Sequence, residues 1–215
     1  MHMQMYTNTP TQRRRGRPPK HQQGINETRD TLLRSGVEIL TEKGFSAAGL
    51  DEILKRVNVP KGSFYHYFNS KEAYGAALIQ HYDNFFAHKL DTFLQDTQLK
   101  PLDRIKGFVQ DATNGMERFG FRRGCLVGNL GQEMGALPEP YRELLKSIFE
   151  RWQQKTETCL KEAQQAGDIS KNLDCKSLAL VFWIGWEGAV LRAKLEQNQN
   201  PLQQFSNFFF NSLNC

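Results

Sequence analysis

Residues 50–71 read LDEILKRVNVPKGSFYHYFNSK and predict two short helices joined by a tight turn, with a third helix beginning at the end. The first helix, Leu50–Val57, carries apolar residues at helical spacing on one face. It ends at Asn58-Val59-Pro60, because proline disfavours a helical residue before it and suits the first turn of the next helix. The second helix, Lys61–Tyr67, is too short and too aromatic to be stable alone. This arrangement is typical of a helix-turn-helix that reads DNA.

The same stretch resembles the helix-turn-helix of TetR-type transcriptional repressors. The resemblance is carried by the run Val59-Pro60-Lys61-Gly62-Ser63-Phe64-Tyr65-His66-Tyr67-Phe68 with Lys71 beyond it, and upstream by Leu40, Gly44-Phe45, Leu50 and Ile53. It covers residues 26–75. It implies an all-α homodimer, in which each subunit has an N-terminal three-helix helix-turn-helix DNA-binding domain and a C-terminal helical ligand-binding and dimerisation domain.

The residues expected to read bases lie at the start of the second helix. Small or polar groups there can approach base edges in the major groove, which suits Lys61, Gly62 and Ser63. The aromatic rings of Phe64 and Phe68 are instead expected in the core, where they would hold this short helix in place.

Phosphate contacts are expected from the residues that follow. Tyr65, His66 and Tyr67 can donate to phosphate oxygens, and Lys71 can do so from the first turn of the next helix. For Tyr67 a half-buried structural role is the alternative. Proteins that resemble this one often open the first helix of the motif with hydroxyl residues, but here that position reads Ala48-Gly49. A backbone N–H group is therefore expected to replace the side-chain contact.

The N-terminal residues 1–24 form an expected disordered basic arm. They contain five basic and no acidic side chains, which equals the net charge of +5 of the whole 215-residue chain: Arg13, Arg14, Arg15, Arg17 and Lys20. Arg15-Gly16-Arg17-Pro18 resembles the core of an AT-hook, whose arginines lie in a narrow A·T minor groove. The interpretation is an arm that touches DNA, with a merely solvated run of charge as the alternative.

The rest of the chain divides into a DNA-binding domain over residues 25–71 and an effector-sensing and dimerisation domain over residues 72–215. The first helix is expected over residues 26–43, with Asn26 as its N-cap and Gly44 as its end. Asn69 or Ser70 is expected to cap a helix to residue 94, and further helices are expected over residues 101–118, 125–134, 141–166, 173–195 and 201–213.

Several function classes lack a pattern in this chain. It has no glycine-rich phosphate loop, metal-ligand spacing or serine elbow, so neither an enzyme nor a cofactor is expected. Residues 1–12 lack the apolar segment of a signal peptide, and the most apolar stretch, Leu178–Leu191, is short and contains an acid. The cysteines at 125, 159, 175 and 215 are widely spaced, which fits reduced thiols in the cytoplasm.

Cys125 is the candidate sensor residue, because it follows Arg122 and Arg123 at the expected start of a helix. Both neighbouring cations and a helix N-terminus stabilise a thiolate, the form that attacks electrophiles or is oxidised. The segment Gly124-Cys125-Leu126, with Lys194 late in the apolar helix, resembles the electrophile- and oxidant-responsive branch typified by the N-ethylmaleimide-responsive repressor. That resemblance implies Cys125 as sensor and Lys194 as its partner. A buried apolar cysteine beside an ordinary ligand pocket is the alternative.

Large aromatic residues dominate the C-terminal part, and Phe86, Trp152 and Trp183 are candidates for an effector site. With interspersed glycines they suit either a cavity between helices or a plain core, and both interpretations stay open. Glu187 in the most apolar helix is a pocket acid, a buried partner for a basic side chain or part of an exposed polar stripe, and the structural interpretation is favoured.

The last two helices are expected to pair with their copies in a second subunit. Gly185 and Gly188 would permit close approach, and Phe205, Phe208 and Phe209 would supply an apolar stripe.

Together these observations predict a repressor that is released from a pseudo-palindromic operator by a small-molecule effector or by modification of a reactive cysteine. Its expected partners are double-stranded operator DNA, the effector and a second copy of the chain, without a membrane. The alternatives are a constitutive architectural DNA-binding dimer and, with less support, a thiol enzyme built on Cys125.

Overall fold

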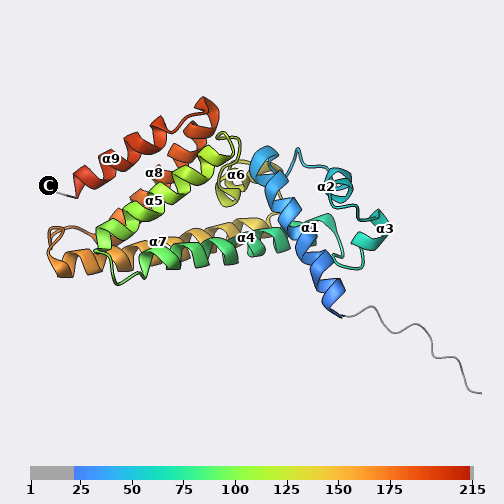
Figure 1. The fold of residues 1–215 in the computed structure, drawn as a ribbon, viewed down its shortest axis with the longest axis horizontal. Coiled ribbons are helices and arrows are strands. Elements are labelled where there is room, and N and C mark those ends of the chain that lie inside the picture. Colours follow the sequence, from blue (N-terminus) through green and yellow to red (C-terminus); the bar gives the residue numbers. More distant parts are fainter. Residues whose placement is uncertain (1–21, 214–215) are drawn as a thin grey trace, which may run out of the picture.

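The computed structural model describes residues 22–213, and every regular element in that range is a helix, which confirms the predicted all-α class (Figure 1). In chain order the elements are α1 (Gln22–Lys43), α2 (Leu50–Arg56), α3 (Lys61–Phe64), α4 (Lys71–Leu94), α5 (Pro101–Arg118), α6 (Leu126–Gln132), the 3₁₀ turn η1 (Met134–Ala136), α7 (Pro140–Ala166), α8 (Cys175–Glu196) and α9 (Asn200–Ser212). The predicted arm arginines, Arg13, Arg14, Arg15 and Arg17, lie outside the described residues.

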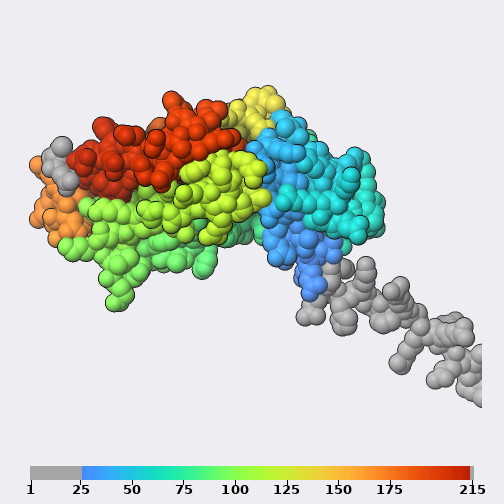
Figure 2. Space-filling model, turned by 45° about the horizontal axis from the view of Figure 1, so that its top comes forward, coloured from blue at the N-terminus to red at the C-terminus, as the bar shows by residue number. Residues whose placement is uncertain are grey.

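We call residues 22–70, with α1 to α3, the head and residues 71–213, with α4 to α9, the body. The head occupies one end of an elongated molecule, and α6 lies where head and body meet (Figure 1). Figure 2 shows the same division on the surface, with α8 and α9 running along the body away from the head.

The head is held on the body by buried rings. Phe64 and Phe68 are buried as predicted, and both pack against Tyr74 in the first turn of α4, at centroid distances of 5.3 and 4.7 Å. The Tyr74 hydroxyl in turn donates a hydrogen bond to the Leu32 carbonyl oxygen of α1 (2.6 Å). α3 therefore gains from these contacts the stability that so short a helix lacks alone.

Local signals account for most helix ends. Gly44 adopts a φ of +82° and ends α1 as predicted, and Ser70 caps α4 by accepting a hydrogen bond from the Ala73 amide (3.0 Å). Asn58 has a φ of 54° in the turn between α2 and α3, a conformation that asparagine tolerates better than most residues.

Two predicted boundaries near the head are wrong. Asn26 does not cap α1, because α1 already begins at Gln22. α3 ends at Phe64 rather than Tyr67, because the His66 and Tyr67 amides donate to carbonyls three residues back, at 3.1 and 2.9 Å, in successive turns. The other helices begin and end within two residues of their predicted bounds.

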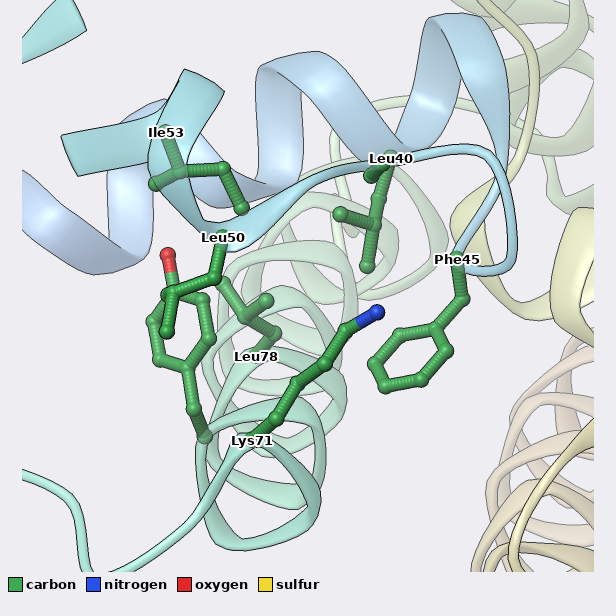
Figure 3. A pocket seen from close by; sticks show the side chains of 8 residues that line it. Leu40, Phe45, Leu50, Ile53, Lys71 and Leu78 are labelled. Carbon is green, nitrogen blue, oxygen red and sulfur yellow. The ribbon is translucent and has the colours of Figure 1, made fainter. Parts of the chain in front are cut away.

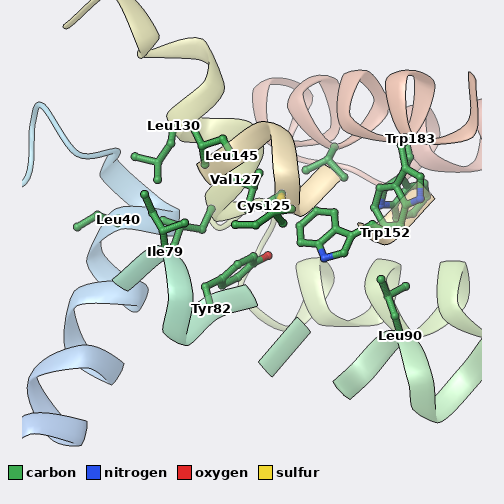
Figure 4. Packing of buried hydrophobic residues seen from close by; sticks show 14 of the residues in the cluster. Leu40, Ile79, Tyr82, Leu90, Cys125, Val127, Leu130, Leu145, Trp152 and Trp183 are labelled. Carbon is green, nitrogen blue, oxygen red and sulfur yellow. The ribbon is translucent and has the colours of Figure 1, made fainter. Parts of the chain in front are cut away.

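The body is a helical bundle with an aromatic centre. α7 lies against α4, α5 and α8, and α8 lies against α9. Trp152 and Trp183 meet at a centroid distance of 5.0 Å, and the Trp183 indole N–H donates to the Thr156 hydroxyl (3.0 Å) (Figure 4). Both tryptophans are fully buried, which places them in the closed core rather than on a ligand-accessible surface.

One face of α8 and α9 is apolar and exposed. Its large exposed apolar residues are Leu180, Val181, Ile184, Leu195 and Phe208. The predicted stripe is only partly correct, since Phe209 is buried and Phe205 packs onto Gly185 within the same subunit, where any Cβ would overlap its ring. Despite this face, none of the helices within residues 22–213 has the length and apolarity to cross a bilayer.

Candidate functional site

The outer end of α3 presents the residues expected to read bases. Lys61 and Gly62 are exposed and Ser63 is partly exposed, and a Cβ placed on Gly62 would meet no atom within 4 Å. The buried Phe64 anchors the helix behind them. This end of α3 is therefore free to approach a surface as close as a DNA groove.

Lys61 is held beside α2 by an ion pair. Its Nζ lies 3.0 Å from Asp51 Oδ1, and both side chains are exposed. The hydrogen bond to Asp51, with its charge, raises the pKa of Lys61, so the ammonium group remains charged at neutral pH. Exposed pairs of this kind stabilise a fold little, so Lys61 can leave Asp51 for a base or phosphate at small cost.

The three residues after α3 differ in exposure. Tyr65 is 53 % exposed and His66 is exposed, whereas Tyr67 is half-buried and packs against the core. All three lie in the turns between α3 and α4. Tyr65 and His66 are therefore the more accessible of the predicted phosphate contacts.

Lys71 extends along the surface of a narrow crevice between α1, α2 and α4. Its ammonium group lies over the Phe45 ring, 4.8 Å from the centroid, and Figure 3 shows the side chain directed between Leu40 and Phe45. The crevice has a volume of about 10 Å³, which is room for one water molecule. It is a gap in the packing between the head and the start of α4 and is too small for an effector.

A carboxylate at the end of α6 holds the turn between α1 and α2. Glu133 accepts hydrogen bonds from the backbone amides of Phe45 (3.0 Å) and Ser46 (2.7 Å). A Cβ at Gly44 would overlap this carboxylate, so the close approach requires glycine there as well as the positive φ. As the sequence indicates, Gly49 caps α2 without a side-chain hydrogen bond.

The Thr41 carbonyl oxygen at the end of α1 is a second joint between head and body. It accepts hydrogen bonds from Asn129 Nδ2 (3.0 Å), the Gly124 amide (3.2 Å) and Lys194 Nζ (3.3 Å). Among the interactions of the described residues, none joins Lys194 to Cys125. Partial burial lowers the pKa of Lys194, and its ammonium group serves the contact with α1.

A cavity of about 590 Å³ lies between the head and the body. Its walls come from α1, α4, α5, the segment before α6, and α8, and they combine aromatic rings with charged groups. The lining residues are Arg34, Val37, Glu38, Thr41, His81, Tyr82, Phe85, Phe86, Lys89, Ala112, Gly115, Met116, Arg118, Phe119, Arg123, Gly124, Cys125, Trp186, Glu187 and Val190. Phe86 lines this cavity, whereas Trp152 and Trp183 lie in the core and Trp186 takes the place expected of them.

Cys125 is the N-cap of α6 and part of the cavity wall. Its sulfur accepts a hydrogen bond from the Gly128 amide (3.4 Å), which agrees with the predicted helix start. Burial, followed by the charge of Glu187, raises the pKa of the Cys125 thiol well above its usual value. The expected stabilisation of a thiolate by arginine is wrong, because Arg123 turns towards Glu38 and Glu42, at 3.7 and 4.0 Å.

Glu187 and Tyr82 surround this thiol. The Glu187 carboxyl is within hydrogen-bonding reach of Cys125, and burial raises its pKa to about 7. A Cβ on Gly128 would overlap that carboxylate, so the glycine makes the space for it. Figure 4 shows Tyr82 beside Cys125, and burial, followed by the nearby charges of Cys125 and Glu187, raises the pKa of the Tyr82 hydroxyl.

The sequence interpretation gave no functional role to three residues of this region: Tyr82, Asn129 and Glu133. For Glu187 a pocket acid was one of three interpretations, but a structural role was favoured, whereas the residue lines the cavity. A signal existed for two of the first three, because Asn129 and Glu133 are four residues apart and so share one side of α6. The contact between Glu187 and Cys125 joins residues far apart in the chain and has no local signature.

Comparisons with known proteins agree with this arrangement. Residues 32–74 match the family described as bacterial regulatory proteins of the tetR family, and residues 101–209 match the tetracyclin repressor-like C-terminal domain. Transcriptional regulator AcuR of Cereibacter sphaeroides is 52 % identical over 200 residues, covering 93 % of this chain and 91 % of that protein. The HTH-type transcriptional repressor NemR of Escherichia coli is 33 % identical, covering 83 % and 89 %. A crystal structure of regulatory protein TetR from Rhodobacter sphaeroides is 54 % identical with a TM-score of 0.82, covering 84 % and 95 %.

Proposed function

The chain belongs to the TetR family of transcriptional regulators, not to a family of enzymes, and on this premise we propose that an effector in the cavity releases it from operator DNA. The observation that carries the proposal is the wall of the cavity, to which both α1 of the head and helices of the body contribute. A molecule bound in the cavity would contact the head and the body at once. It would therefore favour one position of the head relative to the body.

Two sets of hydrogen bonds would transmit a shift of the head relative to the body to the DNA-binding helix α3. The Thr41 carbonyl and the Glu133 carboxylate join α6 to the end of α1 and to the turn before α2. Cys125 begins the same α6 helix and lines the cavity. A coupling of about 1–3 kcal/mol lowers operator affinity by about 5- to 150-fold, which is enough to switch transcription.

Operator recognition requires two copies of the head. We infer a homodimer joined through the exposed apolar face of α8 and α9, because that face would otherwise remain in water. Two α3 helices about 34–36 Å apart then enter successive major grooves of a pseudo-palindromic site. The basic residues 13–20 add sequence-independent contacts and steepen the salt dependence of binding.

Cys125 gives the cavity a reactive group for electrophilic effectors. Its sulfur lies in the wall, so covalent modification would place an adduct inside the cavity and disturb the cap of α6. Non-electrophilic effectors of suitable shape would act through occupancy alone.

The test is a mobility-shift titration of the full-length protein on the DNA upstream of its own gene, with N-ethylmaleimide as electrophilic probe. We expect the wild-type protein to be released and Cys125→Ser to bind DNA normally and stay bound. Cys175→Ser is the matched control and should respond like wild type, since Cys175 lies at the start of α8 away from the cavity. An unchanged response in Cys125→Ser would contradict the covalent route.

The alternative of a constitutive architectural DNA binder predicts a body without an internal site. The cavity of about 590 Å³ beside Cys125 disfavours it. Operator binding that is indifferent to electrophiles and to a panel of small molecules would restore that alternative.

A further inference from the structure

The Cys125 thiol has no cation to stabilise its thiolate. Among the described residues, Arg123 is turned to Glu38 and Glu42, with its guanidinium over the Phe119 ring (4.2 Å), and Lys194 is bound to α1. A buried thiol in this setting stays protonated, yet the thiolate is the form that attacks electrophiles. Reaction at this cysteine therefore needs a neighbouring group that takes the proton.

Glu187 is the group placed to do so. Its carboxylate occupies the space above Gly128, where the first turn of α6 has no side chain, and this space lies beside the Cys125 side chain. The thiol is within hydrogen-bonding reach of that carboxylate, and both residues line the cavity. The Gly128 amide donates a hydrogen bond to the Cys125 sulfur at 3.4 Å, and the Tyr82 hydroxyl, which also lines the cavity, lowers the pKa of this thiol.

We propose that Glu187 accepts the proton of Cys125 when an activated alkene reacts at this thiol. This inference rests on the proposed role of Cys125 as a site of effector modification. It assigns the activation of this thiol to the partly buried Glu187, whereas the sequence predicted that Arg122 and Arg123 would stabilise a thiolate.

The step is an addition of S–H across a carbon–carbon double bond. As the bond from sulfur to the β-carbon forms, the thiol proton passes to the Glu187 carboxylate, and the π electrons move onto the carbonyl of the electrophile. The Gly128 amide and the Tyr82 hydroxyl stabilise the charge that develops on sulfur. Glu187 then returns the proton to the α-carbon, so that no oxidant or further reactant is needed.

Glu187 titrates among several other groups that face the cavity. Cys125 and Tyr82 are nearest, and the remaining charged or titratable groups of the lining are Arg34, Glu38, His81, Lys89, Arg118 and Arg123. Burial raises the pKa of Glu187 to about 7, against a smaller lowering by Cys125, so that a large fraction of it is ionised at neutral pH. Its carboxylate is then a base matched to the working pH of the protein.

The experiment measures the rate of Cys125 modification by N-ethylmaleimide in the full-length protein, by peptide mass spectrometry, between about pH 6 and pH 9. For wild type, we expect the rate to rise with pH up to an inflection near 7 and then to level off. For Glu187→Gln, we expect a loss of about 100-fold at neutral pH and no inflection, with the rate rising across the whole range. Tyr82→Phe should lower the rate without moving the inflection.

A pair of glycine variants separates the position of the carboxylate from its chemistry. Gly128→Ala pushes Glu187 aside and should reproduce most of the loss, whereas Gly131→Ala on the same helix meets no atom within 4 Å and should keep the wild-type rate. Cys159 and Cys175 serve as internal references, since their rates should not change in any variant.

Three outcomes of the modification-rate measurements would overturn the inference. If Glu187 only suppresses the thiolate by its charge, Glu187→Gln will react faster than wild type, and that outcome overturns the inference while the proposed function stands. If Cys125 of the wild-type protein is not modified at all, the covalent route falls together with the inference. A lower plateau with an unmoved inflection in Glu187→Gln would mean a merely structural role and would also overturn it.

Discussion

The head and the body place their functional side chains in opposite ways. In the head, Lys61 stands on the surface above a buried support, Phe64, only three residues further along the chain. In the body, Tyr82, Cys125 and Glu187 come from three separate segments and meet behind the surface. A substitution at the reading edge can therefore change binding without changing stability, whereas one in the cavity changes reactivity and stability together.

The largest expected effect tests the first half of this contrast. Phe64→Ala should lower the free energy of unfolding by about 3–5 kcal/mol, because it empties a site with no exposed surface. Lys61→Ala should leave it almost unchanged, since both members of its ion pair are exposed. Guanidinium unfolding followed by circular dichroism, at one protein concentration, measures both values. Equal losses would mean that α3 is not an exposed edge on a buried support.

The next effect is a pH dependence that belongs to the body. Burial raises the pKa of Glu187 from 4.5 to about 7, so the folded protein keeps a proton that the unfolded chain releases between these values. The free energy of unfolding therefore falls as pH rises through this window. Glu187→Gln removes this titration, so we expect its free energy of unfolding to fall by about 1–3 kcal/mol less than that of wild type over the same pH window. This range is below what the full pKa shift would give, because Glu187 is partly accessible from the cavity.

Denaturant unfolding at about pH 5 and pH 8 measures this difference. Lys61→Ala is the control from the head, and its pH dependence should match that of wild type. A Glu187→Gln profile parallel to wild type would place the carboxyl in water, contrary to its position over Gly128.

The smallest effect sharpens the contrast at the DNA-binding end, between Lys61 of α3 and Lys71 at the start of α4. Lys61→Ala should cost about 1 kcal/mol of discrimination against mutated operators, because it removes a donor to base edges. Lys71→Ala should weaken binding to every sequence alike and reduce the salt slope by ~0.9 per site, because it removes a phosphate contact. Fluorescence anisotropy at several salt concentrations gives both quantities. If the two variants behave alike, the division between base and phosphate contacts is wrong.

The sequence predicted the head well because its determinants are neighbours in the chain. Gly44 and Ser70 mark helix ends by their own conformation or hydrogen bond, and Phe64 lies inside because the turn before it fixes which side of α3 faces Tyr74 of α4. Even the error in the length of α3 is local, since it concerns tight turns at residues 65–67.

The chemistry around Cys125 could not be predicted in the same way. Its neighbours in sequence, the arginines, were expected to stabilise a thiolate, but Arg123 finds carboxylates on α1 that the sequence does not place nearby. The groups that set its pKa are Glu187, 62 positions away, and the burial that the whole bundle supplies. For the same reason the sequence did not distinguish Trp186, which lines the cavity, from Trp183, which packs against Trp152 and Thr156 of α7.

The hydrogen bonds from residues 45 and 46 to Glu133 have an evolutionary consequence. The donors of this joint are main-chain amides, so changes in the side chains of that loop leave it intact as long as glycine precedes it and proline is absent. The acid must be supplied by the other half of the molecule. A hybrid that joins the head of another regulator to this body would therefore retain the Glu133 hydrogen bonds. A hybrid that joins this head to another body would lose them, unless that body supplies its own carboxylate.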